Sequence, residues 1–118
     1  MKTPERTVDM LVGMFDLSER RKFDIKKPDG SVGMSLYFKS ITRSDRKRAQ
    51  SLAHTDQALD ISTQMLCQMA ELENGSKAFA SADVVKLQRE LPEKILNDLE
   101  LFLFELADEA SLDEAKND

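Results

Sequence analysis

One alternating segment, interrupted by a single turn, constrains the fold of this chain more than any other part of its sequence. Over 21–27, Phe and Ile alternate with charged residues, and over 32–39 Val, Met, Leu and Phe alternate with Gly, Ser, Tyr and Lys. A period of two residues is typical of half-buried strands. The Pro-Asp-Gly-Ser sequence at 28–31 supplies a preset φ angle, a capping side chain and a glycine that accepts the left-handed conformation. The sequence therefore predicts a β-hairpin over about 21–39.

The apolar face of this hairpin needs a cover, because a lone hairpin is only marginally stable in water. The cover must come from the helices that follow or from the sheet of another copy. Helical periodicity and capping signals predict four helices after the hairpin. Thr42 or Ser44 is expected to cap the first helix, and the second is expected over 56–72. Ser81 or Asp83 is expected to cap the third helix, and Pro92 to be the first residue of the fourth. Before the hairpin, residues 5–15 are expected to form a short helix or a strand-like arm.

The length of 118 residues fits one domain. The expected fold class is α+β, with an N-terminal β-hairpin followed by a bundle of three to four α-helices. We expect a single domain over 1–107, with the hairpin at 21–39 and the helices within 44–106. The acidic segment 108–118 is expected to be a disordered tail.

The last helix carries more apolar side chains than one core face requires. When the residues are placed on a helix with about 100° of rotation per residue, one stripe of apolar side chains and the apolar positions beside it form a core face of ordinary width. Its members are Ile95, Leu96, Leu99, Phe102, Leu103 and Leu106. Leu101 and Phe104 fall on the other side of the helix. That side also carries Glu93, Asn97, Glu100 and Glu105, and the spacing of its acids is typical of a solvated face. Leu101 and Phe104 are either scattered surface hydrophobic residues or contacts for a groove in a partner.

Charge is distributed unevenly along the chain, whose net charge is −5. The segment 20–48 contains ten basic and three acidic residues, whereas 56–118 contains five basic and fifteen acidic ones. Such asymmetry permits nucleic-acid binding, and it also permits head-to-tail association between copies. The candidate contacts in the basic part are Arg43, Arg46, Lys47 and Arg48.

Residues for catalysis are scarce. His54 is the only histidine and Cys67 the only cysteine, and they are expected on different segments, with the Cys67 thiol buried and reduced. The four glycines are scattered and form no phosphate-binding loop. We expect no enzyme, no metal and no cofactor. No apolar run approaches the roughly 20 residues that span a bilayer, and Glu5 and Asp9 interrupt any export signal, so a cytoplasmic protein is expected.

The order of these elements resembles that of the tail assembly chaperones of long-tailed bacteriophages, which are small α+β proteins encoded between the tail-tube and tape-measure genes. The likeness covers roughly 20–106. It rests on the hairpin, the strand that leads into the first charged helix, the Met- and Leu-rich helix, and the start of the last helix. In sequence these are Lys26-Lys-Pro-Asp-Gly-Ser-Val32, Leu36-Tyr-Phe-Lys39, Ile41-Thr-Arg-Ser-Asp-Arg46, Phe79 with Asp83 and Leu87, and Leu91-Pro92.

The resemblance implies a protein that coats the tape-measure protein, recruits tail-tube subunits, self-associates and leaves before the virion is complete, all in the host bacterial cytoplasm. On this view Leu101 and Phe104 contact tape-measure helices or a neighbouring copy. The four bases of 43–48 contact an acidic protein surface. Two alternatives remain: a small nucleic-acid-binding regulator that acts through the basic 43–48 segment, and a secretion-type chaperone or other adaptor for helical clients.

Overall fold

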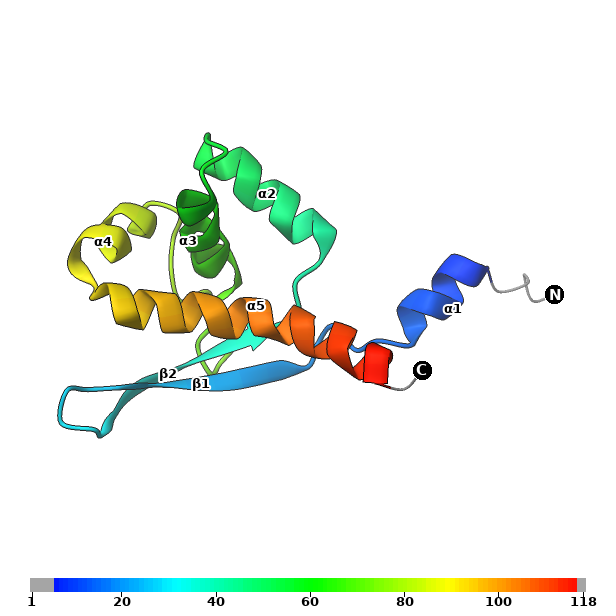
Figure 1. Ribbon diagram of the computed structural model, residues 1–118, viewed down its shortest axis with the longest axis horizontal. Helices are drawn as coiled ribbons and strands as arrows, with labels where there is room; N and C mark the ends of the chain where they lie inside the picture. The colour runs from blue at the N-terminus through cyan, green and yellow to red at the C-terminus, as the bar shows by residue number, and fades with distance from the viewer. Residues whose placement is uncertain (1–5, 117–118) are drawn as a thin grey trace.

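The computed structural model describes the backbone of residues 6–116 and the side chains of residues 6–105. The fold is α+β, with a short N-terminal helix, an antiparallel hairpin and four helices that pack together (Figure 1). This arrangement confirms the predicted fold class. The elements are α1 (Thr7–Gly13), β1 (Arg20–Lys26), β2 (Val32–Lys39), α2 (Arg43–Ala53), α3 (Ala58–Met69), α4 (Asp83–Glu90) and α5 (Glu93–Lys116).

The hairpin turn forms as its sequence predicts. The Gly30 N–H donates to the Lys27 carbonyl at 2.9 Å, and the Lys27 N–H donates to the Ser31 carbonyl at 2.8 Å. Asp29 Oδ1 accepts from the Ser31 N–H at 2.9 Å. Gly30 has a φ of 90°, which an L side chain rarely adopts. These local contacts close the turn between β1 and β2, whose pairing register shifts once, between Ile25 and Lys26.

Helices cover only half of the hairpin's apolar face. Leu36 and Phe38 are fully buried, whereas Val32 and Met34, nearer the turn, are exposed. In Figure 1 the turn end of the hairpin extends beyond the helices. The predicted face is correct, but the helical cover stops short of its outer half.

The helix starts confirm some of the predicted caps and correct others. Thr42 caps α2, because its side chain accepts from the Asp45 N–H while Asp45 accepts from the Thr42 N–H. Neither Ser81 nor Asp83 caps α4, whose N-cap is Ala82 without a side-chain bond. Pro92 precedes the first residue of α5, and its carbonyl accepts from the N–H groups at 95 and 96.

The core lies where α3 and α5 meet the covered half of the hairpin. Its fully buried members are Leu36, Phe38, Ala49, Met65, Leu66, Ala70, Leu99 and Leu103. The Phe102 ring on α5 extends this core toward the sheet, with its centroid 5.0 Å from that of Phe23 and 5.7 Å from that of Phe38. Both tilted arrangements are favourable for aromatic pairs.

The two long helices differ in length from the expectation. α3 ends at Met69 and does not reach 72, because Glu71 exchanges two backbone hydrogen bonds with Tyr37 of β2, each 2.9 Å long. α5 continues to Lys116, although its end was expected near 106 with a disordered tail after it. Helix-forming Ala, Leu, Glu and Lys dominate that last segment.

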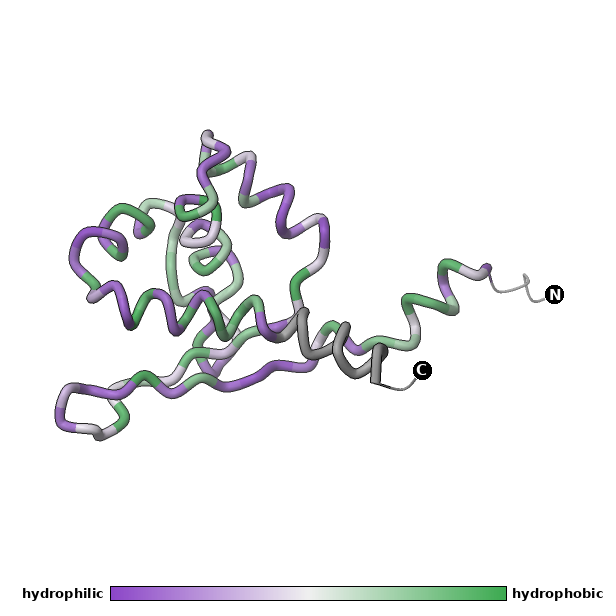
Figure 2. Tube along the Cα trace, viewed as in Figure 1, coloured by the Kyte–Doolittle hydropathy of each residue, from purple (hydrophilic) through white to green (hydrophobic). Residues whose placement is uncertain are grey.

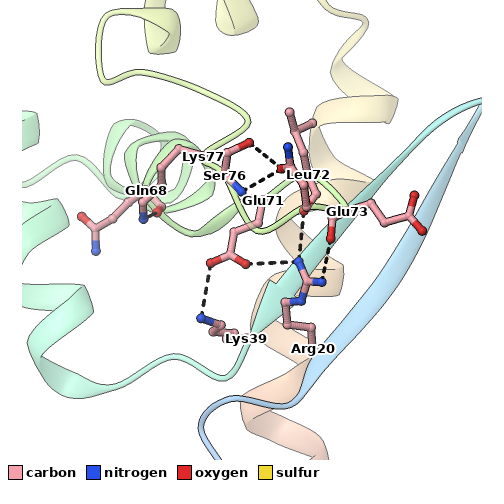
Figure 3. A network of polar contacts seen from close by, with 9 residues as sticks. Arg20, Lys39, Gln68, Glu71, Leu72, Glu73, Ser76 and Lys77 are labelled. Carbon is pink, nitrogen blue, oxygen red and sulfur yellow. Dashed lines mark hydrogen bonds and ion pairs between the residues drawn. The ribbon is translucent and has the colours of Figure 1, made fainter.

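Arg20 at the start of β1 ties the hairpin to the segment after α3 (Figure 3). Its guanidinium donates from Nη1 to Glu71 Oε1 at 3.3 Å and to the Leu72 carbonyl at 3.0 Å, and from Nη2 to the Glu73 carbonyl at 2.9 Å. It also lies 4.8 Å from the centre of the Tyr37 ring. Lys39 pairs with the second oxygen of Glu71 at 3.5 Å. One side chain thus joins segments that are about fifty residues apart in sequence.

Candidate partner-binding surfaces

The four predicted bases lie together on α2 and are all exposed. We call Arg43, Arg46, Lys47 and Arg48 the basic α2 surface. The first three share one face of the helix, because they are spaced by three and four residues. Figure 2 shows α2 as a largely hydrophilic helix. Within the described residues, none of the four has an ion-pair partner. This surface can therefore accept an acidic partner.

Leu101 and Phe104 do not form the exposed pair that the sequence predicts. Leu101 is 56% exposed, but Phe104 is partly buried and packs against the core. The core face of α5 is wider than the helical wheel indicated, because both the sheet and α3 contact this helix. The placement of Phe104 on the outer face was wrong. Leu101 alone keeps its predicted position on the surface.

A larger apolar surface lies on α1 and the residues just after it. All seven large apolar side chains between 8 and 17 are 48% to 71% exposed. Of these, Val8, Leu11 and Val12 fall on one side of α1 at helical spacing, and Phe15 follows two residues after the helix. We call these four residues the apolar arm. In Figure 1, α1 lies away from α2, α3 and α4, on the side of the molecule where α5 ends. The sequence showed this cluster, but its periodicity did not predict that the cluster would lie outside the core.

A groove of about 460 Å³ opens between α3, α4 and α5. We call it the α3–α5 groove. Three acids and several amides line it, together with three leucines. The lining residues are Gln57, Leu59, Asp60, Thr63, Gln88, Leu91, Glu93, Leu96, Asn97 and Glu100. No basic residue is among the described residues that line this groove.

Glu100 is the most buried charged group of the groove, with 7% of its surface exposed. The Thr63 hydroxyl donates to its Oε2 at 2.9 Å, and burial raises the pKa of the carboxyl group although this hydrogen bond opposes the shift. The sequence interpretation placed Glu100 on a solvated face. Its neighbours at i−4 and i+3, Leu96 and Leu103, belong to the predicted core face and could have indicated burial.

Glu100→Gln is expected to stabilise the fold at neutral pH. An acid whose pKa is higher when folded than when unfolded adds stability at low pH and loses it as pH rises through the folded pKa. Removing the buried charge should therefore raise the free energy of unfolding by about 1 kcal/mol at pH 7. The gain should disappear below the ordinary Glu pKa of about 4.3. Urea unfolding at both pH values measures it.

The matched control for this prediction is Glu105→Gln, which removes an exposed carboxylate from the same helix. It should change stability little at either pH. A Glu100→Gln effect that is the same at both pH values would contradict the prediction, because it would arise from shape and not from charge.

The single cysteine and histidine are not brought into one site. Cys67 is buried on α3 as predicted, and burial, helped by the charges of Asp83 and Glu100, raises its pKa to about 12, so the thiol stays protonated at neutral pH. His54 is exposed at the C-cap of α2, with a φ of 55°. Among the described residues, no three His, Cys, Asp or Glu side chains are grouped as metal ligands.

In the part of the chain that the structure describes, no helix has the length and apolar character needed to cross a membrane. Comparisons with protein-family models, with curated proteins and with solved structures found no match to this chain.

Proposed function

We propose that this chain is a tail assembly chaperone of a long-tailed bacteriophage. It binds the tape-measure protein, helps to recruit tail-tube subunits in the host bacterial cytoplasm, self-associates, and is absent from the mature virion. It acts by binding, without a catalytic step or a cofactor. The support from sequence is the resemblance over 20–106 described above.

The apolar arm is the observation that carries this proposal. Monomeric soluble proteins rarely leave a contiguous row of large apolar side chains uncovered, and such surfaces mark protein–protein contacts. The arm presents residues at helical spacing, which suits pairing with an apolar stripe on a client helix. Leu101 adds a second exposed contact on α5. A long helical protein such as the tape measure offers stripes of this kind along its length.

Removing the apolar arm is expected to weaken client binding. Leu11→Ser/Phe15→Ser should reduce affinity for helical tape-measure fragments at least roughly tenfold, because apolar anchors dominate such interfaces. The fold should be unchanged, since neither side chain is buried. Size exclusion with light scattering, followed by calorimetric titration, measures complex formation. Leu101→Ser should weaken binding to a smaller extent.

Val85→Ser is the matched control, because it removes an apolar side chain of similar exposure from α4. It should leave binding unchanged. If no tape-measure fragment binds the wild-type chain, or if the control weakens binding as much as the arm variant does, the proposal is wrong.

A nucleic-acid-binding regulator remains the second candidate, because the basic α2 surface is exposed and lacks ion-pair partners within the described residues. It requires binding to duplex DNA that weakens steeply with salt. Arg46→Glu/Lys47→Glu would abolish such binding, whereas the apolar-arm variant would keep it.

A further inference from the structure

We propose that the α3–α5 groove is a binding site for a guanidinium or ammonium group, and that the basic α2 surface of a second copy of this chain supplies it. This inference deepens the self-association included in the proposed function and rests on it. It names the two surfaces that meet.

Glu100 is a buried acid without a cationic partner in the described part of the chain. Its one described donor is the Thr63 hydroxyl, which has a single proton and lies 2.9 Å from Glu100 Oε2 and 3.1 Å from the Leu59 carbonyl. That proton must be shared between two acceptors. A buried carboxylate with so little compensation favours an incoming cation that can donate several hydrogen bonds.

The rest of the groove also favours a basic side chain. Asp60 and Glu93 add two acids to Glu100, and no described lining residue is basic. The three carboxylates are not grouped as a metal-ion site. Leu59, Leu91 and Leu96 border the groove and can pack against the aliphatic part of an Arg or Lys side chain. The lining therefore suits the whole of such a side chain, its charge and its stem.

The chain cannot fill this groove with its own α2. That helix packs on the opposite side of α3, where Gln68 Nε2 donates to the Asp45 carbonyl at 2.8 Å. Thr63, which faces the groove, and Gln68 are about 140° apart around α3 at 100° per residue. Figure 1 shows α2 and α4 on either side of α3. The two complementary surfaces of one molecule point apart, and only separate copies can bring them together.

Charge complementarity favours a second copy over nucleic acid as the partner. Arg43, Arg46 and Lys47 share one exposed face of α2, and the groove supplies an equal number of acids. A phosphate backbone could contact α2, but the acidic groove would repel it. Because groove and α2 are different surfaces, the contact is head-to-tail, and it builds a ring if the rotation closes or a chain if it does not.

Two complementary variants test this contact. Asp60→Lys/Glu93→Lys reverses charge in the groove and leaves α2 intact, whereas Arg46→Ala/Lys47→Ala removes charge from α2 and leaves the groove intact. Each variant alone should be monomeric in sedimentation velocity. An equimolar mixture should form a dimer that grows no further, because one intact groove then meets one intact α2. Lys22→Ala/Lys26→Ala on the outer face of β1 is the charge-matched control for the α2 variant and should assemble like the wild type.

Glu100→Gln gives an independent readout. It should weaken wild-type assembly roughly tenfold while stabilising the isolated fold at neutral pH, and a variant that merely damaged the structure would not do both. Circular dichroism of every variant confirms folding.

The outcomes distinguish this inference from the proposed function. A wild-type chain that stays monomeric at low salt, or groove and α2 variants that still assemble, would overturn the inference. A monomer that binds tape-measure fragments would overturn the inference and the proposed self-association, and would leave the chaperone role standing. An oligomer that depends on both surfaces but ignores every fragment would support it and count against the chaperone. A monomeric chain that loses DNA binding on α2 substitution would assign that surface to nucleic acid instead.

Discussion

Phe102→Ala is expected to destabilise the fold by about 3 kcal/mol, which is typical of removing a large aromatic side chain from a core. The ring contacts both Phe23 and Phe38 at the point where α5 meets the sheet. Its loss leaves a cavity and removes two favourable ring pairs. Thermal unfolding followed by circular dichroism should show a midpoint lower by roughly 10 °C.

Leu101→Ala is the matched control, because Leu101 is the preceding residue on the same helix but is 56% exposed. It should change the free energy of unfolding by no more than about 0.5 kcal/mol. Equal destabilisation by the two variants would mean that α5 is rotated from the orientation described. The comparison thus tests the facing of the helix independently of any partner.

Arg20→Ala is expected to have the second largest effect, a loss of about 2 kcal/mol. The substitution removes the ion pair with Glu71, two hydrogen bonds to backbone carbonyls and the contact with the Tyr37 ring. Hydrogen bonds from a charged donor contribute more than neutral ones, and Glu71 would keep only Lys39 as a basic partner among the described residues. Urea unfolding measures the loss.

Lys22→Ala provides the control for Arg20, because Lys22 is on the same strand and pairs with Asp24 at 3.6 Å in an exposed setting. Lys22→Ala should lower the free energy of unfolding by no more than about 0.5 kcal/mol. Arg20→Lys should lower the free energy of unfolding by an amount between those of Arg20→Ala and Lys22→Ala. A lysine ammonium keeps the charge but cannot reproduce the forked contacts to Glu71, Leu72 and Glu73. If Arg20→Ala lowers the free energy of unfolding no more than Lys22→Ala does, the contacts of Arg20 with the segment after α3 do not stabilise the fold.

The parts of the fold that were predictable depend on local chemistry. The turn at 28–31 and the Thr42 cap each use residues within a few positions of one another, and both form as expected. The Arg20–Glu71 tie joins residues 51 apart in sequence and leaves no local pattern. Periodicity could not predict it.

The candidate site was predictable only in its charged half. The basic α2 surface is exposed as expected, since the 11 residues of α2 include only two alanines and one leucine to bury. Phe104 and Glu100 were misplaced because a helical wheel gives directions but not the width of the buried face. That width depends on α3 and the sheet, which both contact α5. The α3–α5 groove forms only where α3, α4 and α5 pack together, and no local sequence pattern predicts that packing.

The seven-residue length of α1 has a thermodynamic consequence for any partner that the apolar arm receives. Isolated helices shorter than about 12 residues are only marginally stable in water, because the free-energy cost of nucleating a helix exceeds the stabilisation from a few backbone hydrogen bonds. α1 buries no side chain that could offset this cost. Recognition by the arm would then be coupled to helix formation, with part of the interaction energy consumed in ordering the segment. Such coupling gives moderate affinity over a large apolar contact, which suits the release of a client that the proposed function requires.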